Sequence, residues 1–380
     1  MRSVRDLDVA GKRVLLRSDL NVPLDGGRVA DATRIRAAMP TVELLLERGA
    51  RVVLCSHLGR PRGERKPELS LRPVADRVAE LLDREVAFGE EPGDLRMLEN
   101  LRFDPREERN DPSLAAELAA EADVYVNDAF GAAHRAHAST EGVAHLLPAA
   151  AGLLLEAELE AFARLLERPQ HPFVVVIGGV KVADKIGVID RFTQLADSIL
   201  IGGAMAFTFL AAGGTPVGSS RQEDESGRDT ARRAMADAEQ HGCELLLPVD
   251  VVVADRFAAD AETKLVGADA IPDGWMGLDI GPETTELYAG RLAGAQTVFW
   301  NGPMGVFELK PFAHGTLAVA RAVAASHAVS VVGGGDSVAA ANAAGVADRI
   351  THVSTGGGAA LELIEGRPLP GVEVLEGSPV

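Results

Sequence analysis

Short apolar runs alternate with longer segments of helical period along the whole chain. The apolar runs are rich in β-branched residues and predict buried strands over 13–16, 51–54, 124–126, 173–177, 198–201, 297–300 and 329–332. Between them, apolar positions with a helical repeat predict helices over 33–48, 114–122, 185–195, 226–241 and 312–325. Strands that alternate with helices are typical of parallel sheets covered by helices on both faces. We therefore predict an α/β fold.

A boundary between two lobes is predicted near residues 150–170. Pro148 and Gly152 precede the amphipathic stretch LLLEAELEAFARLLER, which is long enough for one continuous helix. Pro169 and Pro172 follow it and precede a new strand. We predict two Rossmann-like lobes with a cleft between them: a first lobe over 1–150, a connecting helix over 151–168 and a second lobe over 169–365.

Composition narrows the class of protein. A chain of 380 residues has room for two domains, each with its own core. Its net charge of −18 argues against a nucleic-acid or anionic-membrane partner. The first residues contain no secretory apolar region, and the most apolar run, 146–155, is about half the length that spans a bilayer. Two cysteines make neither a disulfide framework nor a metal cluster. We expect a cytoplasmic protein.

Glycine clusters in the second lobe predict a phosphate site. They follow predicted strands at 178–179, 202–203 and 333–335. Glycine lets the backbone approach a ligand, and a following helix directs its N–H groups at an anion. In the third cluster, Asp336 could hold Mg²⁺ and the Ser337 hydroxyl could cap the helix. The alternative is a tight turn with an ordinary helix cap.

Charged residues near these turns support the same interpretation. Lys181 and Lys185 follow the first cluster, and a lysine beside a glycine turn suits phosphate. Glu308, in WNGPMGVFE, could accept ribose hydroxyls. The alternative for all three is a solvated surface charge. Neither GxxxxGK[ST] nor GxGxxG occurs, which argues against a P-loop enzyme and a standard dinucleotide fold.

Polar residues of the first lobe predict an anion site. They follow predicted strands or begin the next helix: Asp19, Asn21, Arg34, Arg36, His57, Arg60, Arg102 and Arg135. Each alone could be a turn former or a solvated side chain. Together, several arginines near strand ends suggest a small, multiply anionic ligand. Motifs for serine hydrolysis and zinc chemistry are absent from the sequence. A nucleotide lobe that faces an anion lobe indicates a phosphotransferase.

At this point the chain closely resembles the phosphoglycerate kinase family. The first-lobe motifs are RSDLNVP from Arg17, SHLGRP from Ser56, ENLRF from Glu99 and DAFGAAHRAHAST from Asp128. Those of the second lobe are GGVKVADKI, GGAMAFTFL, LPVD, GLDIGP, WNGPMGVFE and GGGDS, and HVSTGGGAALELIEG from His352 closes the match. They run in the family's order across practically the whole chain.

The resemblance implies reversible phosphoryl transfer between 1,3-bisphosphoglycerate and ADP, which yields 3-phosphoglycerate and MgATP. It implies Mg²⁺ as cofactor and a monomer. The implied phosphoglycerate-binding residues are Asp19, Leu20, Asn21, Arg36, His57, Leu58, Gly59, Arg60, Arg102 and Arg135. The implied nucleotide-binding residues are Lys181, Lys185, Gly202, Gly203, Gly277, Leu278, Asn301, Val306, Glu308, Gly334, Gly335, Asp336 and Ser337, with Asp336 on the metal. The implied catalytic residues among these are Arg36, Lys181, Lys185, Gly334 and Gly335.

Similarity to the family also implies that 366–380 completes the first lobe, and we expect a hinge near 354–358. Some positions depart from the usual family pattern, among them Leu20, Val180 and Ala211. None of these changes removes a charge assigned to the chemistry. Two rival functions remain: a kinase for another small carboxylate such as acetate or aspartate, and a two-lobed solute-binding protein.

Overall fold

The computed structural model describes residues 1–377 and divides them into two compact units. Unit 1 comprises Met1–Glu160 and the C-terminal segment from Gly366 onward; unit 2 comprises Ala161–Glu365. Residues 378–380, the end of the segment expected to complete the first lobe, lie outside the described residues. Within residues 1–377, no helix has the length and apolar character needed to cross a membrane.

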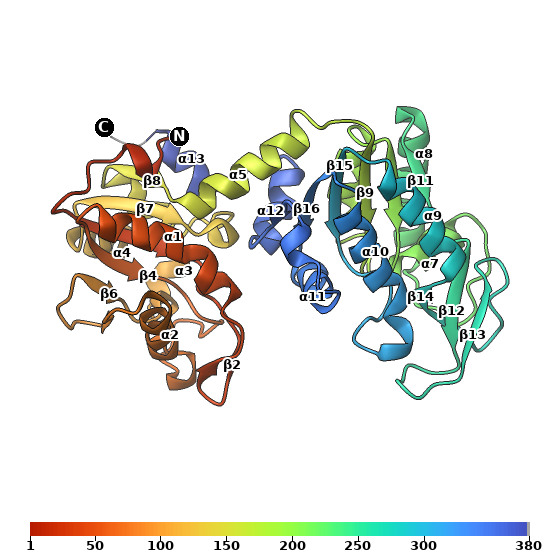
Figure 1. Cartoon of the computed structure of the whole chain (residues 1–380), viewed down its shortest axis with the longest axis horizontal. Helices are drawn as coiled ribbons and strands as arrows, with labels where there is room; N and C mark the ends of the chain where they lie inside the picture. Colours follow the sequence, from red (N-terminus) through yellow and green to blue (C-terminus); the bar gives the residue numbers. More distant parts are fainter. Residues whose placement is uncertain (378–380) are drawn as a thin grey trace. The chain divides into compact units, whose positions relative to one another are not determined.

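Unit 1 is built on a sheet of six parallel strands (Figure 1). In spatial order they are β5 (Ala87–Phe88), β6 (Leu95–Met97), β4 (Arg51–Cys55), β1 (Arg13–Ser18), β7 (Val124–Asp128) and β8 (Ala149–Ala151). Alternate strand residues such as Leu16, Leu54 and Val126 form a core with α1 (Thr33–Glu47) and α2 (Arg72–Leu82). Both faces of the strands are buried, which explains their continuous apolar runs.

Shorter elements complete unit 1. They are η1 (Val4–Asp6), the hairpin of β2 (Leu24–Asp25) and β3 (Arg28–Val29), η2 (Pro67–Leu69), η3 (Leu101–Phe103), α3 (Pro105–Glu108), α4 (Pro112–Ala120), η4 (Phe130–Ala132), η5 (Gly142–His145) and α13 (Pro370–Glu376). Helix α13 is held by backbone hydrogen bonding from Gly371 N to Ala133 O at 2.9 Å. The Asn127 amide donates to Gly371 O at 2.8 Å. Residues from the end of the chain therefore pack in this unit.

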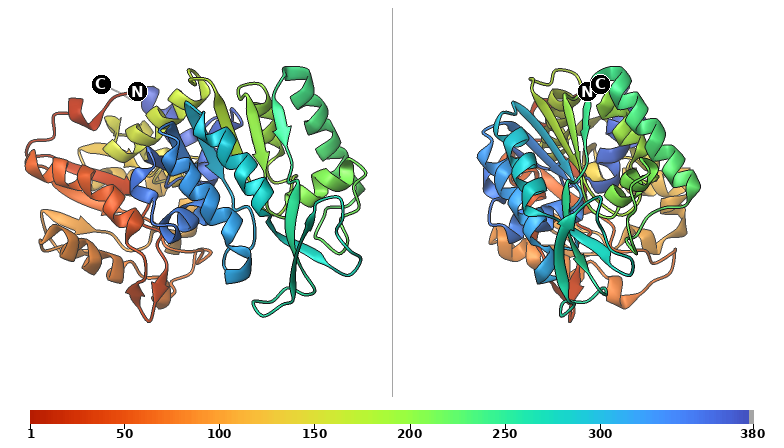
Figure 2. Two further views of the ribbon diagram at one scale, coloured as in Figure 1. Left: turned by 45° about the vertical axis from the view of Figure 1, so that its right-hand side comes forward. Right: turned by 90° about the vertical axis from the view of Figure 1, so that its right-hand side faces the viewer.

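Unit 2 has a second sheet of six parallel strands. Their order is β11 (Glu244–Leu246), β10 (Ser198–Ile201), β9 (Phe173–Ile177), β15 (Thr297–Asn301), β16 (Val329–Gly333) and β17 (His352–Val353). One face packs on α9 (Pro282–Ala293), α10 (His314–Ala325) and α11 (Gly335–Ala343). The other carries α6 (Ile186–Thr193), α7 (Met205–Ala212), α8 (Glu225–His241) and α12 (Gly357–Ile364); Figure 2 shows α8 and α9 on opposite sides.

The prediction of an α/β fold with two parallel sheets is confirmed. All seven predicted strands and five predicted helices are present within about two residues of the expected ends. The connecting helix predicted over 151–168 is α5 (Leu153–Leu166), and residue 151 instead belongs to β8. Strand β8 is three alanines, which carry no strand signal of their own. It forms because residues 149–151 pair with β7.

One sheet of unit 2 was not predicted. Strand β12 (Asp250–Ala254) lies between β13 (Thr263–Gly267) and β14 (Met276–Ile280), and both pairings are antiparallel. Every residue of β13 is exposed or only half-buried, so this strand lacks the buried run from which strands were predicted. The remaining short elements are η6 (Lys310–Phe312) and η7 (Ala347–Arg349). This small sheet supplies residues to the site described next.

Candidate functional site

The polar residues of unit 1 lie beyond the ends of four neighbouring strands. Asp19–Asn21 follow β1, His57–Arg60 follow β4, Arg102 lies in η3 after β6, and Arg135 follows β7. Strands β6, β4, β1 and β7 are adjacent in the sheet and parallel. Parallel strands end at one edge, where α/β folds bind ligands. The topology therefore brings these strand-end residues to the same edge, whereas the predicted Arg34 and Arg36 lie on α1.

Hydrogen bonds join the first two loops. The Asp19 carboxylate is buried and accepts from Arg34 Nη1 at 3.0 Å. The Asn21 side-chain oxygen accepts from the Gly59 amide at 2.9 Å. Leu20 is fully buried, and its amide donates to Ser56 Oγ at 3.0 Å. Asp19 and Asn21 thus already have partners within the protein, and these partners hold them in place.

The loop after β6 is tied to the loop after β4. Asn100 Oδ1 accepts from the Leu58 amide at 3.2 Å, and its Nδ2 donates to the Leu58 carbonyl at 2.8 Å. Arg102 donates through Nη1 to the Gly59 carbonyl at 2.9 Å, and its Nε lies 3.3 Å from Glu108 Oε1. Burial and the nearby Arg135 lower the pKa of Arg102 to about 10. Arg102 therefore remains a cation at pH 7.

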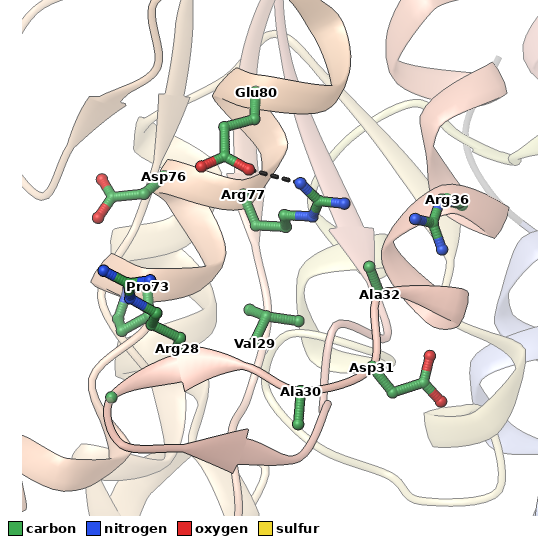
Figure 3. A pocket seen from close by; sticks show the side chains of 11 residues that line it. Arg28, Val29, Ala30, Asp31, Ala32, Arg36, Pro73, Asp76, Arg77 and Glu80 are labelled. Atoms are coloured by element: carbon green, nitrogen blue, oxygen red, sulfur yellow. Dashed lines mark hydrogen bonds and ion pairs between the residues drawn. The ribbon is translucent and has the colours of Figure 1, made fainter.

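Three arginines of the predicted site keep their guanidinium donors available. Within residues 1–377, the side chains of Arg36, Arg60 and Arg135 make no hydrogen bond or ion pair. Arg36 is exposed and lines a cavity of about 590 Å³ between the β2–β3 hairpin and α2 (Figure 3). On the α2 side of this cavity, Arg77 is paired with Glu80. Uncommitted guanidinium groups suit a multiply anionic ligand.

The candidate nucleotide residues of unit 2 follow the same topological rule. Residues 202–203 follow β10, 178–185 follow β9 and 334–337 follow β16, and 301–308 begin at the last residue of β15. These four strands are adjacent in the sheet and parallel. A cavity of about 830 Å³ opens beside these loops and the small antiparallel sheet. Seven predicted residues line it: Lys185, Gly203, Gly277, Leu278, Val306, Glu308 and Asp336.

Six predicted nucleotide residues do not line this cavity: Lys181, Gly202, Asn301, Gly334, Gly335 and Ser337. Lys181 is exposed on the loop after β9. Asn301 contacts the site indirectly, because its Oδ1 accepts from Lys185 Nζ while its Nδ2 donates to the Gly333 carbonyl at 2.8 Å. Burial lowers the pKa of Lys185 to about 8, although the nearby Asp336 acts in the opposite direction.

The expected helix-capping role of Ser337 is wrong. Its buried hydroxyl accepts from the Gly302 amide at 2.5 Å, so it connects the loops after β15 and β16. Gly334 occupies the cap of α11, without a side-chain bond. A φ of +91° at Gly334 favours glycine, and a Cβ there would lie 2.8 Å from Asn301 Nδ2. The Ser337 hydroxyl therefore bonds to the loop after β15 instead of capping α11, and only the tertiary structure shows that this loop is close enough.

Loop-to-loop packing accounts for two further glycines. A Cβ at Gly178 would lie 2.0 Å from the Pro303 carbonyl oxygen. Gly203 has a φ of +67°, and its Cβ would lie 2.5 Å from the Gly179 carbonyl oxygen. These positions require glycine in the protein itself, before any ligand is considered.

Several residues that build the site were missed. Arg34 was noted, but not as the partner of Asp19; Asn100 was quoted in ENLRF without a role. Glu223 accepts from the Val182 amide at 2.6 Å and so holds the loop that carries Lys181. None of the quoted motifs contains Glu223, which lies 41 residues after Val182 in the sequence. For Asn100, its place inside a quoted motif was a usable signal.

Comparison with known proteins decides between the remaining functions. The sequence profile of the family described as phosphoglycerate kinase matches residues 4–367. The chain belongs to this family. It is 57% identical to the phosphoglycerate kinase of Moorella thermoacetica, with 98% of each chain covered, and 57% identical to that of Rubrobacter xylanophilus, again with 98% of each covered.

Solved structures agree with this assignment to the family. The phosphoglycerate kinase of Coxiella burnetii matches with a TM-score of 0.91 and 42% identity, and that of Pyrococcus horikoshii with 0.85 and 33%. Each match covers 99% of this chain and 98% of the other. The reaction follows from membership of this family: it is the kinase reaction of glycolysis, reversible phosphoryl transfer between 1,3-bisphosphoglycerate and ADP. The two rival functions are thereby set aside.

Proposed function

We propose that unit 1 binds phosphoglycerate at the edge formed by the loops after β6, β4, β1 and β7, and that unit 2 binds the nucleotide at its own strand ends. The observation that carries this proposal is the gathering of uncommitted arginines in one unit and of glycine turns with Lys185 and Asp336 in the other. The acceptor in the ATP-consuming direction is the carboxyl group of 3-phosphoglycerate.

This chemistry needs no general base. A carboxylate acceptor has an ordinary pKa of about 3.5, and the ADP phosphate oxygen is likewise ionised at pH 7. Catalysis then depends on alignment and on neutralising the charge of the transferring phosphoryl group. Arg36 is proposed to contact that group, because its guanidinium is exposed and uncommitted within residues 1–377. His57 is proposed to orient the phosphoglycerate.

Cations and backbone amides of unit 2 are proposed to complete the charge balance. Lys181 and Lys185 supply point charges near the phosphates. Gly334 and Gly335 lie at the start of α11, a helix of nine residues. The N–H groups of its first turn are suited to bind an anion. Adenine is proposed to lie in the cavity lined by Gly203, Gly277 and Val306.

The residues present fit a magnesium ion held chiefly by the nucleotide. Within residues 1–377 there is no group of three or more His, Cys, Asp or Glu side chains that could hold a metal. Mg²⁺ commonly binds one or two protein carboxylates together with substrate phosphates. Asp336 is exposed, lines the cavity and offers the hard oxygen ligand that Mg²⁺ prefers. When bound, Mg²⁺ neutralises phosphate charge.

Transfer between the units requires their ligands to meet. The reacting atoms must approach to about 3–3.5 Å with water excluded. We propose closure by rotation at the ends of the connecting helix, near 148–152 and 169–172, and at the glycine-rich stretch 354–358. We also propose a monomer located in the cytoplasm, where glycolysis supplies its substrates.

A coupled assay tests this function. The purified chain is given MgATP and 3-phosphoglycerate, and ADP release is followed; acetate and aspartate replace phosphoglycerate in parallel reactions. We expect ADP release that depends on 3-phosphoglycerate and on Mg²⁺, with no turnover of the other two carboxylates. Equal turnover of acetate, or none with phosphoglycerate, would reject the proposed substrate site.

A further inference from the structure

Arg17 is a buried cation to which the reaction assigns no role. It is the fifth residue of β1, its side chain is fully buried, and three of its nitrogens have partners. Nε donates to Ser139 Oγ at 2.8 Å, Nη1 donates to the Ser18 carbonyl at 2.5 Å, and Nη2 lies 3.1 Å from His57 Nδ1. The guanidinium plane is therefore held from three directions.

Behind Arg17 lies an equally buried carboxylate. Glu107 is fully buried and accepts from the Ser139 hydroxyl at 2.6 Å and from the Ser139 amide at 3.0 Å. Because the hydroxyl donates to Glu107, its oxygen lone pairs are directed toward Arg17 Nε. Glu107, Ser139, Arg17 and His57 form one continuous chain of hydrogen bonds, from α3 to the loop after β4.

This chain determines where the imidazole of His57 carries its proton. A guanidinium group has donors only, so His57 Nδ1 must accept and the ring proton must lie on Nε2. Nε2 has no hydrogen-bond partner within residues 1–377, and His57 as a whole is 4% exposed, so Nε2 is the ring nitrogen that can still donate to a ligand. His57 thus has one available donor.

The surroundings of His57 oppose a second proton. Arg17, Arg102, Arg135 and His137 all act electrostatically on the ring. The carboxylates of this cluster pair with the neighbours instead, Glu108 with Arg102 and Glu107 with His137. Burial and then these neighbours hold the pKa of His57 well below its usual 6.5. A proton on Nδ1 would also place two N–H donors against each other.

We propose that Glu107, Ser139 and Arg17 are positioning residues that hold His57 as the neutral Nε2–H tautomer. The inference rests on the proposed function, in which His57 orients phosphoglycerate. The imidazole then gives phosphoglycerate one hydrogen-bond donor, Nε2–H, and the ring stays neutral. The neighbouring arginines supply the positive charge that the anion needs. Binding through His57 is then independent of pH across the physiological range, which suits a reaction that moves no proton.

The first test uses the unliganded wild-type protein. Two-bond ¹H–¹⁵N correlation spectra of ¹⁵N-labelled protein distinguish the two tautomers and the imidazolium, and loss of a signal in His57→Gln assigns it. We expect the neutral Nε2–H pattern without titration between about pH 5 and 8. An Nδ1–H pattern, or titration within that range, would overturn the proposal without any reliance on a variant's folding.

The second test removes members of the chain. In Arg17→Met, His57 should show mixed tautomers, and the KM for 3-phosphoglycerate should rise about tenfold while the KM for ATP is unchanged. Ser139→Ala keeps its amide for Glu107 and should show a smaller effect, about threefold, of the same kind. If Arg17→Met fails to fold, the Ser139→Ala variant and the wild-type spectrum still test whether these residues fix the tautomer of His57.

The matched control is Ser70→Ala. Ser70 also donates its hydroxyl to a carboxylate of unit 1, Glu99, at 2.9 Å, but within residues 1–377 it makes no hydrogen bond to Ser139, Arg17 or His57. Its spectrum and both KM values should match the wild type. Wild-type-like tautomer and KM in Ser139→Ala would reject the positioning role. Failure of the proposed function is distinguishable, because the wild type would then release no ADP with phosphoglycerate whatever its tautomer.

Discussion

The strand-end loops of unit 1 and unit 2 occupy equivalent places in two parallel sheets, yet they are constructed differently. In unit 1, side chains connect the loops: Asn21 bonds to Gly59, Asn100 to Leu58, and Arg17 to His57. In unit 2, glycines let the loops touch directly, as at Gly178 and Gly203. The loops of unit 1 are joined chiefly by hydrogen-bonded side chains. Those of unit 2 combine side-chain bonds, such as the one between the Ser337 hydroxyl and the Gly302 amide, with close backbone packing that requires glycine.

The difference fits the two ligands. A small, multiply charged acid is distinguished by the number and direction of charged donors, which need buried partners to orient them. A nucleotide presents phosphates that backbone amides can bind and a flat base that an apolar cavity can hold. Substitutions should therefore act through side-chain charge in unit 1, and through backbone shape as well as side-chain charge in unit 2.

Arg36→Ala is expected to have the largest effect. If Arg36 stabilises the transferring phosphoryl group, steady-state kinetics should show kcat lower by about 10³–10⁵, because arginines in that role contribute this much. Arg36→Lys should restore only part of the rate. Arg28→Ala, an exposed arginine on the same cavity, should retain the wild-type kcat. A change in the phosphoglycerate KM alone would make Arg36 a ground-state ligand.

Gly203→Ala tests backbone packing in unit 2. The substitution places a Cβ against the Gly179 carbonyl at a φ of +67°, and should lower the free energy of unfolding by about 3 kcal/mol. Gly290→Ala is the control, because its Cβ meets nothing within 4 Å in the middle of α9. Urea titration compares the two. Equal stability of both variants would show that unit 2 tolerates rearrangement of its loops.

Asp336→Asn separates the metal from the nucleotide. MgADP binding should weaken by about 10–100-fold, whereas binding of metal-free ADP should change little, because only the metal loses a charged ligand. Isothermal calorimetry with each form gives both affinities. A similar loss for the two forms would contradict the assignment of Asp336 to Mg²⁺.

The pKa of about 8 at Lys185 predicts a pH dependence confined to the nucleotide side. As pH rises through 8, Lys185 loses its proton, so kcat/KM for ATP should fall about tenfold between about pH 7 and 9. In Lys185→Arg the guanidinium stays charged, and the decline should flatten even if the rate is lower. A wild-type profile that remains level to pH 9 would reject the role of this ammonium group.

Closure of the units should give the smallest signal. Small-angle scattering should show a lower radius of gyration with both substrates bound and little change with either one alone. Gly357→Val, at a φ of +33°, should impair kcat more than the binding of either single substrate. Scattering curves that are the same in all four states would contradict closure.

Local pattern was sufficient for the seven central strands of the two main sheets, from which the candidate residues were chosen, but not for the five strands nearer the sheet edges. Buried strands need apolar residues on both faces, so runs such as 173–177 were visible in the sequence. Strand ends of parallel sheets gather at one edge, so the residues after them could be assigned to a site. Strands β8 and β13 escaped because pairing with neighbours, rather than their own residues, makes them strands.

The partners of each side chain were decided by the tertiary structure alone. The Ser337 hydroxyl suits a helix cap by its position, but Gly302, 35 residues earlier, donates to it instead. His57 was predicted from its motif to bind phosphoglycerate, whereas the proton on Nε2 depends on Arg17, 40 residues away, and beyond it on Ser139 and Glu107. Sequence determined which residue types stand at the ends of the central strands, since the apolar runs that predict those strands are a local pattern. Their hydrogen bonds and protonation depend on residues brought close by folding, and no local pattern encodes that proximity.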